Sequence, residues 1–275
     1  MLRFLLNLIF GMAGRPNGPL GSGDSAELDP TAAPPARATM QTLITSDGDQ
    51  RIVVKDITVS PWRPFCCLKL RYSDGSHAVG SGILIAPDMV LTAAHNLYAL
   101  DLGTFVTSAV AEIGMKDDVA AASARVKHVE ICPGYTRLNV QHPDRFKFDY
   151  GVARLDSNAL YKWAGEYAPI ADQEAIPDAD LSRSLLNVAG YPDNEGALRL
   201  KTDSGPIVAG TLSSSNFRYK MDTMPGQSGC PVFRYHADSK TFLYAGVHVA
   251  GEKDANLARR YDIAMRAQVK SWLSA

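Results

Sequence analysis

From residue 51 to the C-terminus, short apolar segments alternate with turn residues, and this pattern restricts the possible fold more than any other feature. The segments are rich in β-branched and aromatic residues and are bounded by Gly, Pro, Asp or Asn. Runs of about five to eight such residues are typical of strands in an all-β barrel or sandwich. The segments read RIVV, FCCLKLRY, SGILIAP, MVLTAA, ARVKHVEI, GVARL, LLNVAGYP, GPIVAGTL, CPVFRY, FLYAGVHVAG and YDIAM.

Helical periodicity is convincing in one place, the C-terminal tail AMRAQVKSWL. Four apolar side chains recur there at a spacing that puts them on one face of an α-helix. They are Met265, Val269, Trp272 and Leu273. We therefore expect an all-β protein with an N-terminal β unit over residues 42–160, a C-terminal β unit over residues 161–275, and a helix at the end of the second unit.

The first 41 residues have a different composition. Met1 to Ala13 carries one positive charge, at Arg3, and an apolar stretch that is too short to span a bilayer. It resembles a secretory signal, with an ordinary amphipathic leader as the alternative. Residues 14–41 are rich in Gly, Pro and Ala, which indicates a linker or pro-segment of low order. We expect a secreted or periplasmic protein with no stable membrane span.

Charge and cysteine content argue against several classes of function. The 275 residues include 28 Lys and Arg and 29 Asp and Glu, with no basic run, so we expect no nucleic-acid partner. The four cysteines form no CxxC pair and lack histidines at zinc-finger spacing, so we expect no metal site. Cys66 or Cys67 could pair with Cys132, and buried free thiols are the equal alternative. We expect no cofactor and a monomer.

Three local strings carry side chains of complementary chemistry. His95 ends the string LTAAH, Asp149 precedes the apolar strand GVARL, and Ser228 stands between glycines in PGQSGCP. Each has an ordinary interpretation when taken alone. The histidine is then a packed or surface imidazole, the aspartate a turn or cap residue, and the glycines part of a common turn.

Taken together, the three strings meet the requirements of nucleophilic catalysis. A serine hydroxyl is a poor nucleophile unless an imidazole removes its proton, and that imidazole needs an acid to fix its tautomer. The oxyanion that develops needs two backbone N–H donors, which glycines allow a turn to aim inward. The order His, Asp, Ser is the one associated with the chymotrypsin fold.

The strings LTAAH, DYGVARL and GQSGCPV resemble the three signature blocks of chymotrypsin-fold serine proteases. The string NVAGYP, the Gln before the serine, and the HxxG-type string from His248 to Gly251 are more similar to the bacterial glutamyl endopeptidases. The resemblance spans about residues 43–274. It implies two six-stranded β-barrels with a C-terminal helix and an endopeptidase that cuts proteins or peptides. His95 and Asp149 would lie in the first barrel and Ser228 in the second.

The resemblance assigns a role to each matching residue. Ser228 would be the nucleophile, His95 the general base and then acid, and Asp149 the orienting carboxylate. The N–H groups of Gly226 and Ser228 would form the oxyanion hole. Asn96 stands where the larger chymotrypsin group has a half-cystine, so the disulfide that braces that loop must be absent here.

Gln227 is a second departure from the trypsin pattern. Trypsin-type zymogens have an aspartate there, which pairs with the newly cut N-terminal ammonium. An uncharged Gln cannot make that ion pair, so we do not expect activation at the trypsin-like string RIVV that begins at Arg51. The segment from Leu43 to Asp49 instead resembles the mature start of the glutamyl endopeptidases, and we expect maturation near Thr42.

Substrate preference depends on the pocket beside the nucleophile. By the resemblance, Thr223 and His248 would receive a substrate carboxylate, with Gly251 in the same pocket. A hydroxyl and an imidazole suit that task because both donate hydrogen bonds. We expect cleavage after Glu or Asp. Asp222 supports the alternative of cleavage after Lys or Arg, unless it turns away or pairs with His248 or the N-terminus.

Two further alternatives belong to other classes. A chymotrypsin-fold protein can serve in binding without catalysis, although all three triad residues and both glycines are present here. A protease of the α/β-hydrolase fold would need a G-x-S-x-G elbow followed by a helix. The GQSG string lacks that spacing, and a β-rich segment follows it.

Overall fold

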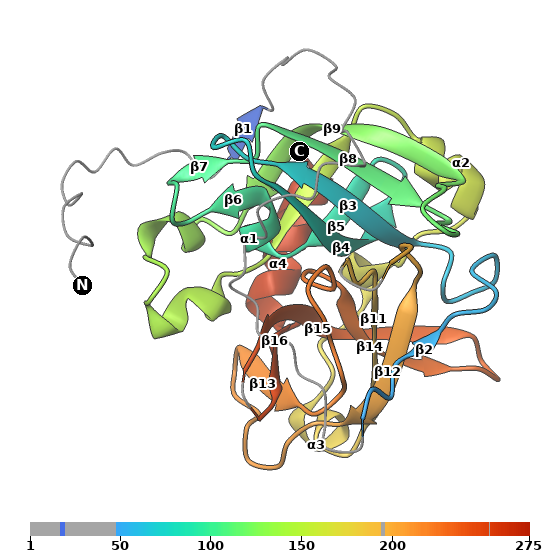
Figure 1. The fold of residues 1–275 in the computed structure, drawn as a ribbon. Helices are drawn as coiled ribbons and strands as arrows, with labels where there is room; N and C mark the ends of the chain where they lie inside the picture. Colours follow the sequence, from blue (N-terminus) through green and yellow to red (C-terminus); the bar gives the residue numbers. More distant parts are fainter. Residues whose placement is uncertain (1–16, 20–47, 194–195, 253) are drawn as a thin grey trace.

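The computed structural model describes residues 17–19, 48–193, 196–252 and 254–275 (Figure 1). Its strands form two large antiparallel sheets and one small one. The first sheet contains β1 (Asn17–Pro19), β3 (Phe65–Arg71), β4 (His77–Ala86), β5 (Met89–Thr92), β8 (Ser108–Ile113), β9 (Ala122–Ile131) and β10 (Gly151–Leu155). The second contains β2 (Ile52–Val53), β11 (Leu185–Gly190), β12 (Lys201–Pro206), β13 (Asn216–Tyr219), β14 (Pro231–His236), β15 (Thr241–Gly251) and β16 (Asn256–Arg260).

The remaining elements are short, apart from the last helix. The small sheet pairs β6 (Tyr98–Ala99) with β7 (Thr104–Phe105). The α-helices are α1 (Ala94–Leu97), α2 (Ala159–Ala164), α3 (Asp178–Leu181) and α4 (Ile263–Leu273). The 3-10 helices are η1 (Tyr135–Arg137), η2 (Pro143–Lys147) and η3 (Ile170–Asp172).

The first sheet closes into a barrel. Its order is β9-β10-β5-β4-β3-β8, and β8 pairs again with β9, so six strands form a ring with β1 added at β9. The side chains of β3 alternate as a strand requires. Cys66, Leu68 and Leu70 pack in one buried cluster, whereas Phe65 and Cys67 pack in the other. The two adjacent cysteines therefore point to opposite faces of β3.

The second sheet runs β13-β16-β15-β14-β11-β12, with β2 paired to the outer edge of β12. An isolated bridge between Ile207, just after β12, and Tyr219 of β13 brings the two ends of this run together. The strand β2 joins this sheet although it precedes the whole first barrel in the chain (Figure 1). The expected fold class is confirmed: a mostly β protein with a closed six-stranded barrel, a second sheet and a C-terminal helix.

A buried aromatic cluster packs the two sheets against each other. Phe65 of β3 lies 5.5 Å from Phe233 of β14, measured between ring centroids, and Phe233 stacks on Phe242 at 4.7 Å. Trp62 adds an edge contact to Phe233. Because aromatic side chains bury large areas, this cluster adds hydrophobic contact between the two sheets.

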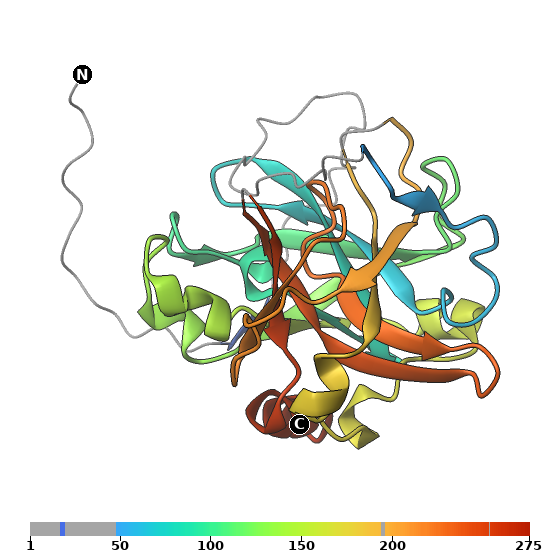
Figure 2. The same cartoon turned by 90° about the horizontal axis from the view of Figure 1, so that it is seen from below.

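The helix α4 confirms the periodicity of the C-terminal tail. Its N-cap, Asp262, accepts a hydrogen bond from the Met265 backbone N–H at 2.8 Å. Met265, Val269 and Trp272 are buried, as the 3.6-residue spacing predicts. The Trp272 ring packs on Tyr150, and α4 also contacts η3 (Figure 2). The helix therefore joins the end of the chain to the segment that carries Asp149.

All four cysteines are free and buried. Of the two alternatives for Cys66, Cys67 and Cys132, the structure has buried thiols and no disulfide. Burial raises the pKa of the Cys66, Cys67 and Cys230 thiols, which keeps them protonated.

The predicted signal sequence, residues 20–41 of the expected pro-segment and the expected maturation point at Thr42 lie outside the described residues. None of the helices in the described part of the chain is both long enough and apolar enough to span a bilayer.

Candidate active site

His95 and Asp149 meet because their strands are neighbours. His95 lies in α1 directly after β5, and Asp149 lies just before β10. The strands β5 and β10 are antiparallel, with Thr92 opposite Gly151, so the end of one strand meets the start of the other. The sequence therefore brings the imidazole and the carboxylate together by ordinary strand pairing.

Two hydrogen bonds fix the histidine on the aspartate. His95 Nδ1 lies 2.8 Å from Asp149 Oδ2, and the His95 backbone N–H donates to Asp149 Oδ1 at 2.9 Å. The carboxylate is 2% exposed. Because the carboxylate accepts at Nδ1, the proton of a neutral ring is held there. Nε2 of His95 is buried and has no hydrogen-bond partner among the described residues, so it is available as a base.

Ser228 lies in the loop between β13 and β14, and its main chain is bonded to the first barrel. Its carbonyl oxygen accepts from the Ser81 backbone N–H at 2.7 Å and from Asn96 Nδ2 at 2.9 Å. Asn96 follows His95 in α1. The serine loop is therefore attached to the helix that carries the histidine, and the serine itself is 4% exposed.

The Asn96 side chain makes a second contact at this attachment. Its Nδ2 also donates to Thr92 Oγ1 at 2.9 Å, so one amide joins the end of β5 to the serine loop. A Cβ on Gly80 would lie 2.6 Å from the same nitrogen, so β4 must also leave room for the Asn96 amide. Sequence reasoning noted Asn96 only as a departure from the family pattern and missed this contact.

Two glycines make the serine loop possible for more than one reason. Gly226 has φ +92° and Gly229 has φ +83°, a region that side chains disfavour. A Cβ on Gly229 would overlap Thr92 Oγ1 and the carbonyl oxygen of Ser81. Gly229 is therefore required by its conformation and by the close approach of the first barrel.

Gly226 is restricted in the same two ways, by its positive φ and by close approach of the segment that follows β11. A Cβ there would overlap the Tyr191 carbonyl oxygen and would lie 2.7 Å from the Asp193 nitrogen. Its own backbone N–H donates to no acceptor among the described residues. An N–H group held in this way can donate to a bound group instead.

Gln227 is held from both sides. Its Oε1 accepts from the Met224 backbone N–H at 3.0 Å and from Arg51 Nη1 at 3.2 Å. Arg51 in turn makes a bidentate contact with Asp49, from Nε to Oδ1 at 2.9 Å and from Nη2 to Oδ2 at 2.8 Å. The Arg51 hydrogen bond holds the pKa of Asp49 below its usual value. Sequence analysis singled out Gln227 but did not foresee Arg51 as its partner.

Asp222 is paired with the same N-terminal segment. It is fully buried, and its Oδ2 accepts from the Gln50 backbone N–H at 2.7 Å. Its own backbone N–H donates to Asp203 Oδ2 at 2.6 Å. This contact with the Gln50 main chain is one that sequence reasoning did not consider.

Thr223 and Gly251 are both partners of Asn256. Thr223 Oγ1 donates to Asn256 Oδ1 at 2.9 Å, and Gly251 is the cross-strand partner of Asn256. Asn256 also donates to the Met221 carbonyl oxygen at 2.6 Å. The Thr223 hydroxyl proton is therefore engaged, and it must turn away from Asn256 in order to donate to a substrate.

His248 lies directly behind the serine loop. Its backbone N–H donates to the Cys230 carbonyl oxygen, and its carbonyl oxygen accepts from Gly229, both at 2.9 Å. Its Nδ1 lies 2.6 Å from the Tyr219 hydroxyl. Burial lowers the pKa of His248 to about 3, and the nearby His95 acts in the same direction.

Within the described part of the chain, no three His, Cys, Asp or Glu side chains lie together in a way that could hold a metal ion.

The family described as Trypsin matches residues 60–273, most of the chain. The chain belongs to the trypsin family. As a member of that family it is a serine endopeptidase, a hydrolase of peptide bonds.

Two curated relatives are proteases by name. A protein called glutamyl endopeptidase, from Bacillus licheniformis, is 27% identical over 202 residues, which are 72% of this chain and 57% of that protein. A protein called extracellular metalloprotease, from Bacillus subtilis, is 25% identical over 237 residues, which are 85% of this chain and 71% of that protein. The chain thus spans part of the length of each.

Solved structures of other proteases share the fold. A Glu endopeptidase in complex with MPD has a TM-score of 0.69 at 20% identity, covering 85% of this chain and all of that one. The protease Anisep from Arthrobacter nicotinovorans has a TM-score of 0.63 at 15% identity, covering 86% of this chain and 99% of that one. These structures share the fold, and the curated relative from Bacillus licheniformis confirms the resemblance to the glutamyl endopeptidases.

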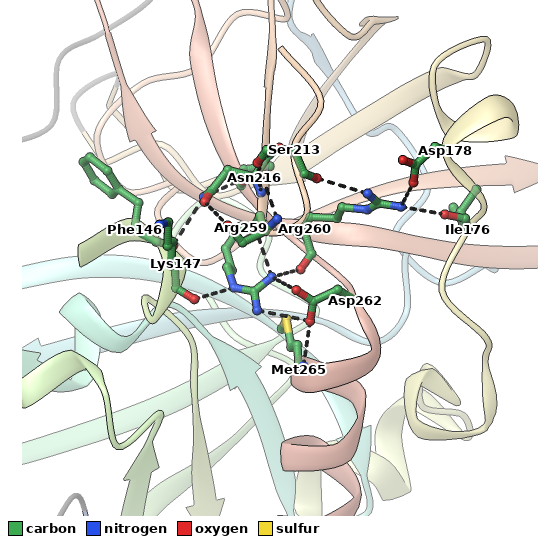
Figure 3. A network of polar contacts seen from close by, with 12 residues as sticks. Phe146, Lys147, Ile176, Asp178, Ser213, Asn216, Arg259, Arg260, Asp262 and Met265 are labelled. Carbon is green, nitrogen blue, oxygen red and sulfur yellow. Dashed lines mark hydrogen bonds and ion pairs between the residues drawn. The ribbon is translucent and has the colours of Figure 1, made fainter. Parts of the chain in front are cut away.

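This trypsin-family chain also has a buried polar network beside the Asp149 segment (Figure 3). Arg259 of β16 donates through Nε to the Lys147 carbonyl oxygen at 2.6 Å and pairs with Asp262 at 2.9 Å. Asn216 donates to the Phe146 carbonyl oxygen at 3.3 Å. The network attaches the loop that precedes Asp149 to the second sheet and to the N-terminus of α4.

Arg259 reaches the aspartate segment by a second route. Its guanidinium lies 5.1 Å from the centroid of the Tyr150 ring, the residue after Asp149. A buried Arg beside a buried Tyr has no sequence signature, because the two residues are far apart in the chain. Sequence reasoning therefore missed Arg259.

Proposed function

We propose that Ser228, His95 and Asp149 are the catalytic triad of this serine endopeptidase and that it cleaves after Glu or Asp. The observation that carries the triad is the pair of hydrogen bonds from His95 to Asp149, at 2.8 Å and 2.9 Å, which leaves Nε2 without a described partner. The carboxylate orients the ring and stabilises its protonated form.

The reaction proceeds in two stages, acylation of the serine and then hydrolysis of the acyl-enzyme. Ser228 Oγ attacks the carbonyl carbon of the scissile bond while His95 Nε2 takes the hydroxyl proton. The negative charge on the former carbonyl oxygen is stabilised by the N–H groups of Gly226 and Ser228. His95 then gives its proton to the leaving amine, and the acyl-enzyme forms. Water repeats the sequence, transfers its proton through His95, and releases the acid and the serine.

The acidic preference rests on the partners of Asp222 and His248. A receptor for Lys or Arg needs an acid that is available to a cation. Asp222 is buried, and one of its oxygens already accepts from Gln50. His248 is bonded to the serine loop through its backbone, and the Thr223 hydroxyl can donate to a substrate carboxylate once it turns away from Asn256.

The triad is tested with a fluorophosphonate probe on the full chain and on any processed form that it yields. We expect labelling that is abolished by Ser228→Ala and kept by Ser157→Ala, a change at an exposed serine. Ser228→Ala should lower kcat/KM by about 10⁴-fold or more, and Asp149→Asn by about 10⁴-fold. Folded protein that is never labelled would support the non-catalytic binding protein instead.

The preference is tested with peptides that differ only in the residue before the cut. We expect Glu to exceed Arg in kcat/KM. A clear preference for Arg would overturn the acidic pocket and support Asp222 as the receptor, while leaving the triad in place.

We also propose that the protein is exported. The expected signal at Met1 to Ala13 and the name of the extracellular relative from Bacillus subtilis support this. Export is tested by fractionation of the producing cell, and retention of all active protein in the cytoplasm would contradict it.

A further inference from the structure

A tyrosine occupies one of the two ring nitrogens of His248. The Tyr219 hydroxyl lies 2.6 Å from His248 Nδ1, and the two rings meet edge to face with centroids 6.0 Å apart. Tyr219 is completely buried and His248 is 1% exposed. A contact this short between two buried polar groups is a strong hydrogen bond, and its direction determines where the imidazole proton sits.

The direction follows from the needs of the tyrosine. Burial raises the pKa of Tyr219 well above its ordinary value, so the hydroxyl keeps its proton. A buried O–H has to donate, and His248 Nδ1 is the acceptor within its reach among the described residues. If Nδ1 carried the imidazole proton, two hydrogens would compete for one contact and the tyrosine donor would lose its partner.

We propose that Tyr219 sets the tautomer of His248, so that the ring is a neutral donor through Nε2 and binds the side-chain carbonyl or carboxylate oxygen of the substrate. This inference rests on the proposed acidic pocket and adds the residue that prepares it. Tyr219 acts through His248 and is a positioning residue.

The backbone holds the ring in the orientation that this role needs. His248 is bonded at its N–H to Cys230 and at its carbonyl oxygen to Gly229, so it moves with the serine loop. Nε2 has no bond to a described residue, and it is not among the polar atoms sealed from solvent without a partner. The small exposed part of His248 is thus consistent with Nε2 as the atom that meets the substrate.

The surroundings keep the ring neutral. Two titratable side chains act on it: Tyr219 from β13 is bonded to Nδ1, and His95 from α1 acts on the ring electrostatically. Neither is an acid that could stabilise an imidazolium. Burial and His95 together lower the pKa of His248 to about 3. A neutral donor also discriminates less strongly than a cation between a carboxylate and a carboxamide.

The substrate class that follows is a side chain with an oxygen acceptor, with Glu ahead of Gln. We expect a Glu over Gln preference of about 10- to 100-fold that is constant from pH 6 to pH 9. Recognition by an imidazolium would instead weaken about tenfold for each pH unit above an ordinary histidine pKa. A preference that fades in this way would overturn the proposal.

The tautomer is measured directly by nitrogen NMR of the full chain labelled at histidine, with His248→Gln to assign the signals. We expect a protonated Nε2 and an unprotonated Nδ1 at pH 5 and at pH 8. In Tyr219→Phe, which keeps the ring and removes only the hydroxyl, this single tautomer should give way to a mixture. A proton on Nδ1 in the unaltered protein would overturn the proposal.

Kinetics of Tyr219→Phe supply the functional readout. We expect kcat/KM for Glu peptides to fall about tenfold, mainly through a rise in KM, with a smaller change for Gln peptides. Tyr261→Phe is the matched control, because it removes a buried hydroxyl with a bond of 2.6 Å to the Ile170 carbonyl oxygen, away from the pocket. An equal rise in KM in both variants would assign the loss to general destabilisation and overturn the positioning role.

Failure of the tautomer assignment and failure of the proposed function give different experimental results. Preference for Arg, or absence of fluorophosphonate labelling, defeats the proposed function and with it the recognition role of His248. Preference for Glu with the proton on Nδ1 defeats the tautomer assignment alone.

Discussion

Arg51 and Gln227, 176 positions apart in the chain, are joined by a buried hydrogen bond of 3.2 Å from guanidinium to side-chain carbonyl. The bond attaches the N-terminal segment of the described chain to the residue just before Ser228. The neighbouring bond from Gln50 to Asp222 does the same six residues before the serine, at 2.7 Å. Together the two bonds hold both ends of the loop that carries Gly226.

Replacing Arg51 should therefore lower activity through the serine loop. In Arg51→Met the stem is kept and the donor is lost, which leaves Gln227 Oε1 with only the Met224 N–H. We expect kcat/KM to fall about tenfold because a hydrogen bond to a charged group is lost. Arg137→Met, at an exposed arginine, is the control. Equal activity in the two variants, measured on one peptide, would show that the N-terminal segment does not support the loop.

Gly229 allows steric overlap to be separated from backbone strain. Gly229→Ala introduces a positive-φ alanine and also a Cβ that overlaps Thr92 and Ser81. Gly75→Ala introduces the same strain, at φ +84°, with nothing within 4 Å. We expect a loss of about 1–2 kcal/mol at Gly75 and of more than about 3 kcal/mol at Gly229, measured by urea unfolding. Similar losses at the two positions would contradict the close approach of the barrels.

Arg259 should influence catalysis without touching substrate. Arg259→Leu removes the bond to the Lys147 carbonyl oxygen and leaves Asp262 without its buried partner. We expect the free energy of unfolding to fall by about 3 kcal/mol. We also expect kcat to fall with little change in KM, because Asp149 is less well placed.

Arg266→Leu is the control for Arg259. Arg266 pairs with Glu174, which is 79% exposed, so its loss should cost less than about 1 kcal/mol. Unchanged kcat in Arg259→Leu, together with a loss of stability, would limit Arg259 to a structural role. Both variants are measured with the same peptide and the same denaturant series.

The residues that sequence reasoning identified are those whose signals are local. The strings around His95, Asp149 and Ser228 are short and can be recognised in the sequence, whereas the pairing of β5 with β10, which brings His95 to Asp149, is seen only in the fold. Asn96, Arg51 and Tyr219 were missed as contacts because each one pairs with a residue brought close only by folding. Their partners are decided by how the sheets approach each other, and no periodicity encodes that.

The same distinction explains the strand at Ile52–Val53. Its β-rich composition was readable, but its partner β12 follows the whole first barrel in the chain. Asp222 is a similar case. Counting from the serine identified the position, whereas the Gln50 bond that occupies one of its oxygens depends on where the N-terminal segment docks.

His248 gives the protein a pH dependence whose sign can be worked out. Its pKa is about 3 in the folded chain, against an ordinary value of 6.5. Between these pH values the unfolded chain binds a proton that the folded chain does not. Stability from this group is therefore complete above about pH 6.5 and is lost as the pH falls toward 3. The integrated loss is on the order of several kcal/mol.

The contribution is isolated by comparing unfolding of the unaltered chain and of His248→Gln from pH 7 down to pH 4. Glutamine does not titrate, so the variant can be less stable at pH 7 and still lose less on acidification. Carboxylates such as Asp49, whose pKa is lowered by Arg51, act in the same acid range in both proteins and cancel in the difference. Parallel stability curves would mean that His248 takes up its proton in the folded state near its ordinary pKa, and an imidazolium would then be present in the pocket at mildly acidic pH.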